Sequence, residues 1–107
     1  MKLCIAATGP DLNSPVDQVF GRCSYFLIVD TETEEFKAIT NEAKEVERGA
    51  GVQASQTVVN LEAKVVICGN IGPNAQTVLE QSGVKVISGF SGIAKEALEK
   101  FKSGELK

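Results

Sequence analysis

Two glycine-rich turns hold the residue types of this chain that could bind an anionic ligand. The first reads Arg48-Gly49-Ala50-Gly51, and the second, residues 69–74, reads Gly-Asn-Ile-Gly-Pro-Asn. Each turn precedes a stretch with helical spacing, and Pro73 suits a first helical position because its missing N–H is no loss there. Unpaired amides at helix starts attract anions. The two turns therefore predict a binding site for an anion or a cluster. The alternative is that the glycines only form the turns that any strand–helix connection needs.

Arginine and cysteine side chains near these turns extend the prediction. The chain has two arginines, Arg22 and Arg48, and a guanidinium fork suits oxo- or sulfido-anions better than an ammonium group does. Arg22 precedes Cys23, so we expect the guanidinium to lower the pKa of that thiol. Cys23 and Cys68 are candidate metal ligands, with core packing as the alternative for both, whereas Cys4 lies within an apolar run and is predicted to be core. The complete set of candidate binding residues is Arg22, Cys23, Arg48, Gly49, Ala50, Gly51, Gly69, Asn70, Gly72 and Asn74.

Composition restricts the class of protein. With 107 residues, 43% apolar composition and a formal charge of -3, the chain is predicted to be one domain spanning residues 1–107. Scattered lysines and an acidic balance argue against a nucleic-acid partner, and strand-sized apolar runs argue against a membrane. Three cysteines without a secretory signal predict reduced thiols in the cytoplasm. The absence of histidine excludes imidazole catalysis and histidine-ligated metal sites.

Hydrophobic periodicity predicts an α/β fold with five strands and three helices in the order β-β-β-α-β-α-β-α. The first strand is apolar on both faces, which predicts a central position in a mixed sheet. The residues around 24–39 read as an antiparallel hairpin, and the later strands as parallel. The last helix is expected to have Ser91 as its cap. The predicted strands are 2–7, 24–30, 35–40, 64–68 and 84–87, and the first two predicted helices are 50–62 and 73–82.

A long connection follows the first strand. Residues 8–21 would lie at the carboxyl end of the central strand and are rich in turn formers: Gly9, Pro10, Asn13, Ser14, Pro15 and Gly21. Such long segments without regular structure are usually functional or disordered. We expect loops 8–22, 48–51 and 69–74 to converge at one end of the sheet, with residues 9–18 the most mobile part of the unliganded chain.

Longer motifs resemble a known family. The segments are Asp11-Leu-Asn-Ser-Pro-Val, Phe20-Gly-Arg-Cys-Ser-Tyr-Phe-Leu-Ile-Val-Asp30, the two glycine turns, and Ser103-Gly-Glu-Leu106. In this order they are similar to the dinitrogenase iron-molybdenum cofactor biosynthesis family across essentially the whole chain. The resemblance implies a ribonuclease-H-like α/β fold and a role in binding and carrying an iron-sulfur or molybdenum-containing sulfide cluster. It also implies cluster-donor and cluster-acceptor proteins as partners, which the sequence does not name.

Three other functions compete with that of a non-enzymatic cluster carrier. A two-metal nuclease needs acidic residues on central strands, and the first strand has none, so enzymatic activity of that kind is rejected. A small anionic-metabolite or phosphate-binding module would use the same amides and is the second hypothesis. A thiol redox sensor would need Cys23 and Cys68 to approach each other, since the chain has no Cys-x-x-Cys pair.

Overall fold

The structure, a computed structural model that describes residues 1–106, is a five-stranded mixed sheet between helices. The strands are β1 (Lys2–Ala7), β2 (Tyr25–Asp30), β3 (Phe36–Thr40), β4 (Val65–Ile67) and β5 (Lys85–Ile87), and the helices are α1 (Ala50–Asn60), α2 (Pro73–Gln81) and α3 (Ala94–Lys102). The predicted α/β class, the mixed sheet and the three helices are confirmed. Two short 3-10 helices, η1 (Phe20–Arg22) and η2 (Glu42–Glu45), add to the order expected from the sequence.

The sheet has the strand order β3-β2-β1-β4-β5. β1 lies at its centre, antiparallel to β2 and parallel to β4, and β5 continues the parallel half. The central position predicted for residues 2–7 is confirmed, and its physical cause is visible in burial: from Leu3 to Ala7 every side chain is fully enclosed. The hairpin of β2 and β3 forms the antiparallel edge, with β3 largely exposed.

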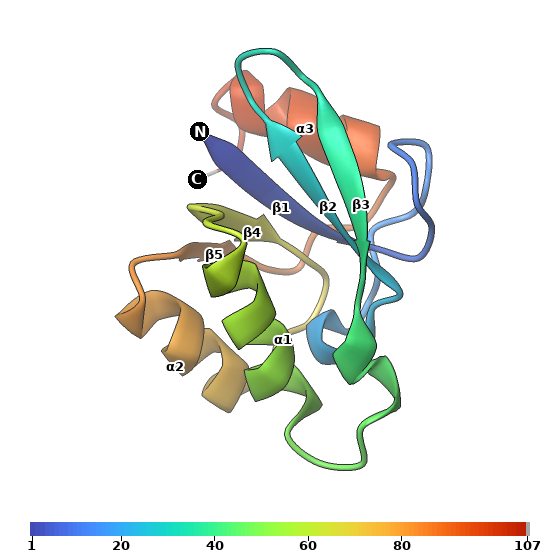
Figure 1. Ribbon diagram of the computed structural model, residues 1–107. Coiled ribbons are helices and arrows are strands. Elements are labelled where there is room, and N and C mark those ends of the chain that lie inside the picture. Colours follow the sequence, from blue (N-terminus) through green and yellow to red (C-terminus); the bar gives the residue numbers. More distant parts are fainter. Residues whose placement is uncertain (107) are drawn as a thin grey trace.

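Two separate apolar layers pack against the two faces of the sheet. α1 and α2 cover one face through Ala54, Val58 and Leu79, whereas α3 covers the other through Ala97 and Leu98. Figure 1 shows α1 and α2 side by side below the strands and α3 behind them. Alternation along β1 supplies both layers, since even-numbered residues face α1 and odd-numbered residues face α3.

The last helix begins later than predicted. Ile93, not Ser91, is the residue before its first turn, and the carboxylate of Glu96 accepts a hydrogen bond from the Ile93 N–H at 3.1 Å. The residues before this helix bond to the loop after β1 instead: the Val16 N–H donates to the Gly92 carbonyl at 2.8 Å. Within the described residues, no helix combines the length and the apolar character that crossing a membrane requires.

Candidate functional site

The three loops singled out from the sequence meet at the carboxyl ends of β1 and β4. They enclose a hollow of about 300 Å³. The starts of α1 and α2 that line it lie toward the lower end of the molecule in Figure 1. The predicted convergence is therefore confirmed. Its lining comes from η1 and the starts of α1 and α2: Val19, Phe20, Gly21, Arg22, Gly49, Ala50, Gly51, Val52, Gly72, Pro73, Asn74 and Ala75.

Glycines set the spacing of the elements around this hollow. A Cβ built on Gly21 would lie 2.8 Å from the N and Cα atoms of Gly51, and a Cβ on Gly51 would lie 3.1 Å from the Cβ of Ala75. At these points η1, α1 and α2 approach each other through backbone or methyl groups. The sequence predicted these glycines as positions that expose amides to a ligand, and the structure adds that Gly21 and Gly51 permit close approach of main chains.

Two helix N-termini open into the hollow without side-chain caps. Gly49 precedes α1 in the left-handed conformation, with φ of 74°, and Gly72 precedes α2 in an extended conformation. Neither residue can offer a side-chain acceptor, and the first turns of both helices contain no acidic residue. Partial positive charge from the first-turn amides of two helices is therefore directed to one place, which favours an anion.

Arg22 lies at the rim of the hollow, but its guanidinium is already engaged. Nη1 donates to the carbonyls of Lys44, at 2.9 Å, and of Val46, and Nη2 donates to the Glu47 carbonyl at 3.4 Å. Arg22 thus connects η1 to the segment that precedes α1. Arg48 is exposed and does not line the hollow, so the structure brings only one of the two predicted arginines to it.

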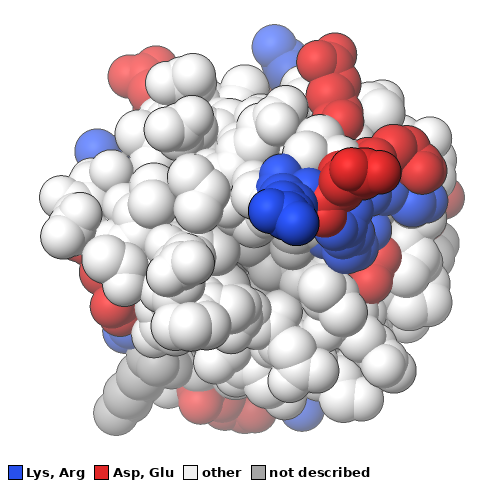
Figure 2. Space-filling model, turned by 90° about the horizontal axis from the view of Figure 1, so that it is seen from below, with Lys and Arg blue, Asp and Glu red and all other residues white. Residues whose placement is uncertain are grey.

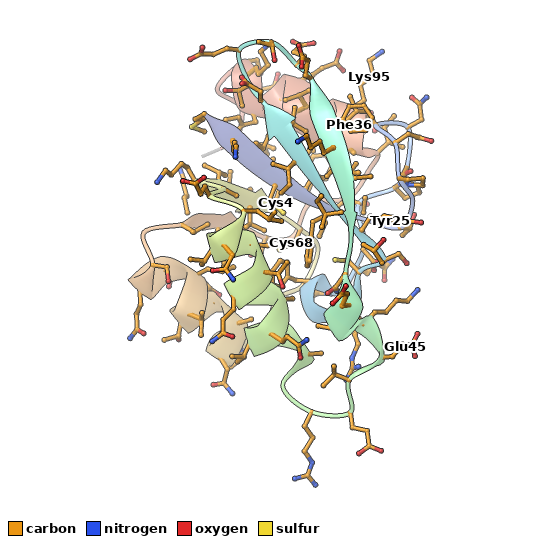
Figure 3. The ribbon with its side chains drawn as sticks, viewed as in Figure 1. Cys4, Tyr25, Phe36, Glu45, Cys68 and Lys95 are labelled. Atoms are coloured by element: carbon orange, nitrogen blue, oxygen red, sulfur yellow. The ribbon has the colours of Figure 1, made fainter. Side chains whose placement is uncertain are left out.

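The three cysteines are enclosed beneath the hollow rather than exposed in it. Cys4, Cys23 and Cys68 have no exposed surface and belong to the apolar layer under α1 and α2. Figure 3 shows Cys4 and Cys68 on this side of the sheet. Burial raises the pKa of Cys23 to about 12, with a further rise from the carboxylate of Asp17. Burial likewise raises the pKa of Cys68 to about 12 and that of Cys4 well above its usual range.

The thiol pKa expected from the sequence is therefore wrong. Arg22 is the last residue of η1, and Cys23 follows it in an extended conformation; the Arg22 side chain is exposed, whereas the Cys23 thiol is buried. Cys23 lies in the core, the alternative given for it from the sequence. The core position predicted for Cys4 is confirmed.

Asn41 is a site residue that sequence reasoning missed. Its side chain is 3% exposed; Nδ2 donates to the carbonyls of Gly21 at 3.1 Å and Cys23 at 2.9 Å, and Oδ1 accepts from the Ala43 N–H at 3.0 Å. It therefore joins η1 to η2 directly above Cys23. The available signal was an asparagine after a β-prone run, a type that often caps a helical turn.

Gly69 and Asn70 face a neighbouring hollow of about 450 Å³ instead. That hollow lies on the side of α3 and shares no lining residue with the first; its lining is Pro15, Val16, Gln18, Gly69, Asn70, Gly89, Phe90, Ser91, Gly92 and Ile93. The two hollows are separated where Val19 pairs with Asn70. A Cβ on Gly69 would lie 2.7 Å from the Cα of Gln18, so this glycine too permits backbone contact.

The long connection after β1 is joined to the rest of the fold by main-chain hydrogen bonds. The Thr8 N–H donates to Pro15, the Asp17 N–H to Ala6, and the Ala94 N–H to Ser14, at 3.0, 2.8 and 2.8 Å. The expectation of a segment without regular structure is wrong, because short antiparallel bridges and η1 organise it. The greater mobility expected for residues 9–18 stays a prediction.

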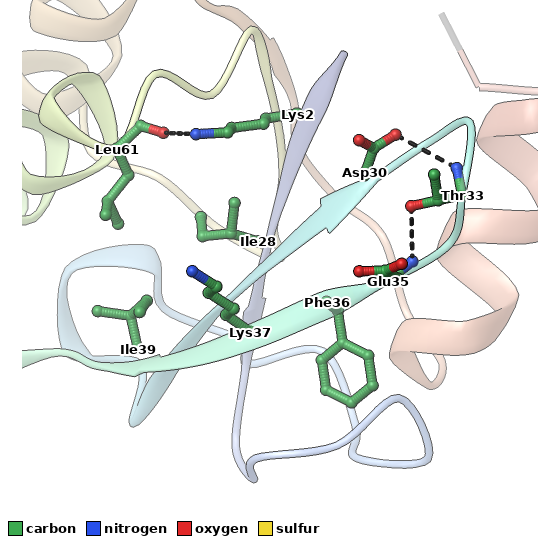
Figure 4. Close-up of a pocket in the computed structure, with 9 residues that line it drawn as sticks. All are labelled: Lys2, Ile28, Asp30, Thr33, Glu35, Phe36, Lys37, Ile39 and Leu61. Atoms are coloured by element: carbon green, nitrogen blue, oxygen red, sulfur yellow. Dashed lines mark hydrogen bonds between the residues drawn. The ribbon is translucent and has the colours of Figure 1, made fainter.

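Charged side chains are unevenly distributed over this end of the molecule. Seen from below, most of the surface is uncharged, and charged side chains gather along one side of it (Figure 2). Arg22 is the one charged residue that lines the hollow, among the residues described. A hollow of about 410 Å³ near the hairpin differs, since Lys2, Lys37, Asp30 and Glu35 surround its apolar floor (Figure 4). Its mixed charges favour no anion.

Comparison with known proteins identifies the family. The sequence pattern of the family described as dinitrogenase iron-molybdenum cofactor matches residues 1–104. This chain belongs to that family. It is also similar to an uncharacterized protein of Methanocaldococcus jannaschii, with 32% identity over 97 residues that cover 88% of this chain and 82% of the relative.

Solved structures of similar proteins agree with the fold of this member of the dinitrogenase iron-molybdenum cofactor family. The apo form of the orange protein from Desulfovibrio gigas superimposes with a TM-score of 0.95 and 30% identity, covering 99% of this chain and 90% of that one. A protein from Thermotoga described as a putative NifB protein superimposes with a TM-score of 0.85 and 33% identity. The match again covers 99% of this chain and 90% of that one.

Proposed function

We propose that this protein binds and carries an anionic iron-sulfur or molybdenum-containing sulfide cluster, or its precursor, in the hollow between the starts of α1 and α2. One observation carries the proposal: two uncapped helix N-termini open into a single hollow whose lining contains no acidic residue, in a member of this family. Backbone amides suit the sulfido or oxo groups of such a cargo, because several donors share the negative charge.

Support for a carrier also comes from the similar structures and from the ligand set. One of those structures is an apo form, and a protein has an apo form when it also has a form with a bound group. Among residues 1–106, no group of three or more His, Cys, Asp or Glu side chains could hold a metal ion. We infer that the cargo arrives already assembled and is held through its own anionic groups. Its donor and acceptor proteins, and a cytoplasmic location, accompany the proposal as predictions.

Ligation of the cluster by the Cys23 or Cys68 thiolate is a separate proposal. Both thiols are enclosed and protonated at neutral pH, because burial raises the pKa of each to about 12. Ligation therefore requires the overlying segments to move first. The ribonuclease-H-like assignment and the absence of catalytic activity likewise remain proposals that follow from the family.

A phosphate or small anionic metabolite is the second candidate, and the buried thiols favour it. Amides and a guanidinium bind hard oxyanions as readily as sulfido groups, and the hollow exposes no soft ligand. The two candidates differ in their spectra. A metal–sulfide cargo gives charge-transfer absorption on binding, whereas phosphate gives heat of binding without colour.

The test is anaerobic reconstitution with tetrathiomolybdate, or with iron and sulfide, followed by metal and sulfide analysis. Asn74→Asp places a carboxylate in the first turn of α2 without changing side-chain size. Two unit charges about 5 Å apart near a surface interact by about 1–3 kcal/mol, so we expect roughly tenfold or greater weakening. The same substitution should raise stability by about 0.3–1 kcal/mol, because a carboxylate favours a helix N-terminus.

Asn60→Asp is the matched control. It makes the same change of charge at the last residue of α1, at the far end from the hollow, and should leave binding unchanged. Equal affinity of Asn74→Asp and wild type for every anion tested would contradict the proposed site. Binding of phosphate with no uptake of metal and sulfide would select the second candidate.

A further inference from the structure

Two side chains tie residues 41–47 to η1 and Cys23. Asn41 is the buried one: its Nδ2 donates to the Cys23 carbonyl and lies 3.7 Å from the Cys23 sulfur. Arg22 is the exposed one, and its guanidinium donates hydrogen bonds to three carbonyls of this segment, those of Lys44, Val46 and Glu47. Cys23 has no exposed surface, and it shares an apolar cluster with Ala43 and the partly buried Val46 of this segment. A reagent therefore reaches its thiol only if part of this packing moves.

The two contacts differ in what a ligand can reach. Asn41 is 3% exposed, so a ligand in the hollow does not touch it. Arg22 lines the hollow, and among residues 1–106 no carboxylate forms an ion pair with it. Within the described residues, the hydrogen-bond acceptors of its guanidinium are neutral carbonyl groups. An anion is the stronger acceptor for a guanidinium, because charge-assisted hydrogen bonds are about twice as strong as neutral ones.

We propose that Arg22 is a positioning residue that keeps residues 44–47 closed over Cys23, and that an anion bound in the hollow draws the guanidinium away and opens access to that thiol. The second half of this inference rests on the proposed function, since it needs an anion in the hollow. The first half concerns only the contacts within the chain. Together they make Cys23 accessible when cargo is present and enclosed when it is absent.

This arrangement gives the buried cysteine a role that neither the hollow nor the core explains alone. A permanently exposed thiol beside an anion site would react with oxidants and free metal ions. A thiol that is uncovered only beside bound cargo meets the metal of that cargo first. Cys4 and Cys68 belong to the same apolar layer but have no contact with Arg22, so they serve as internal references.

The first experiment measures alkylation of each cysteine by iodoacetamide in the folded protein without ligand, resolved by peptide mass spectrometry. In Arg22→Gln we expect Cys23 to react at least about tenfold faster, because losing several hydrogen bonds to a charged group shifts an opening equilibrium by that factor or more. Arg22→Lys, which keeps the charge but loses the fork, should also react faster. Arg48→Gln removes an exposed arginine near the same segment and should react like wild type.

Selectivity among the cysteines decides between local and global opening. Faster reaction of Cys23 with unchanged Cys4 and Cys68 supports the positioning role. Equal acceleration of all three in Arg22→Gln would mean general destabilisation and would overturn it, as would an unchanged Cys23.

The second experiment adds molybdate, an oxyanion that does not alkylate thiols, and measures binding by calorimetry in parallel. Faster alkylation of Cys23 in wild type at saturating molybdate, with no further effect in Arg22→Gln, supports anion-driven opening. Binding with unchanged or slower alkylation overturns that step while leaving the proposed function intact. If molybdate and the sulfide cargo both fail to bind, the proposed function fails, whereas the comparison of Arg22→Gln with Arg48→Gln still decides the positioning role.

Discussion

The contact between η1 and α1 should make Gly21→Ala one of the most damaging small substitutions in the chain. The new Cβ would lie 2.8 Å from both N and Cα of Gly51 and 3.2 Å from the carbonyl carbon of Ala50. All three neighbours are main-chain atoms at the start of α1, so no side-chain rotation relieves the overlap. Either η1 or the first turn of α1 must shift.

The expected cost is that of overpacking a closely packed contact, about 1–3 kcal/mol in the free energy of unfolding. Each kcal/mol lowers the Tm of a domain of this size by about 4–8 °C. Displacement of α1 from η1 also changes the spacing of the amides around the hollow. We therefore expect weaker anion binding in the protein that remains folded.

Gly72→Ala is the control, because it adds the same methyl group to the same hollow. Nothing lies within 4 Å of a Cβ on Gly72, and its φ of -74° and ψ of 158° suit alanine. Urea and thermal unfolding, followed by circular dichroism, compare the two variants. Equal stability of Gly21→Ala and Gly72→Ala would refute the view that main-chain contact fixes this spacing.

Three further predictions concern the layer beneath the hollow. Asn41→Ala should cost about 1–3 kcal/mol in urea unfolding, because the buried carbonyls of Gly21 and Cys23 lose their donor; a cost below half a kcal/mol would show that water replaces the amide. Cys4→Ser should destabilise by about 1–3 kcal/mol where the hydroxyl finds no partner, with metal and sulfide uptake unchanged; lost uptake at full stability would contradict its assignment to the core. Alkaline pH should also destabilise the fold. The pKa of Cys23 is raised in the folded state, so unfolding releases its proton, and stability is lost as pH rises from the ordinary thiol range toward about 12, by roughly 1.4 kcal/mol per pH unit for each such thiol. Urea midpoints of wild type and Cys23→Ala between neutral and alkaline pH measure this slope, and identical slopes would contradict it.

Patterns that repeat along the chain predicted the framework well. Residues 3–7 are apolar on both faces, and such a strand has only a central position open to it. Parallel connections then place the loops after β1 and β4 at one end, which is why the glycine turns could be predicted to meet. Strand limits differ from the prediction by about a residue because strand ends depend on pairing partners that the sequence does not show.

The direction of side chains and the contacts between loops could not be predicted from such repeating patterns. Adjacency in sequence suggested that Arg22 acts on Cys23, yet η1 ends between the two residues, and the structure leaves the guanidinium exposed while it buries the thiol. Ser91 has the chemistry of a cap, but hydrogen bonds between residues 92–95 and the loop after β1 set where α3 begins. Gly69 and Asn70 read as part of one turn with Gly72, and the pairing of Val19 with Asn70 divides that turn between two hollows.

The hydrogen bonds between the loop after β1 and the start of α3 also bear on how the chain folds. Ser14 and Leu12 accept from the Ala94 and Lys95 N–H groups at 2.8 and 2.7 Å, which joins the first part of the chain to nearly the last. Contacts of such sequence separation form slowly because a long loop must close before they contribute. A chain emerging from the ribosome can thus pair β1 with β2, and β2 with β3, early. The loop that lines both hollows acquires its final conformation only after residue 95 has been made, so the binding end of the molecule is completed last.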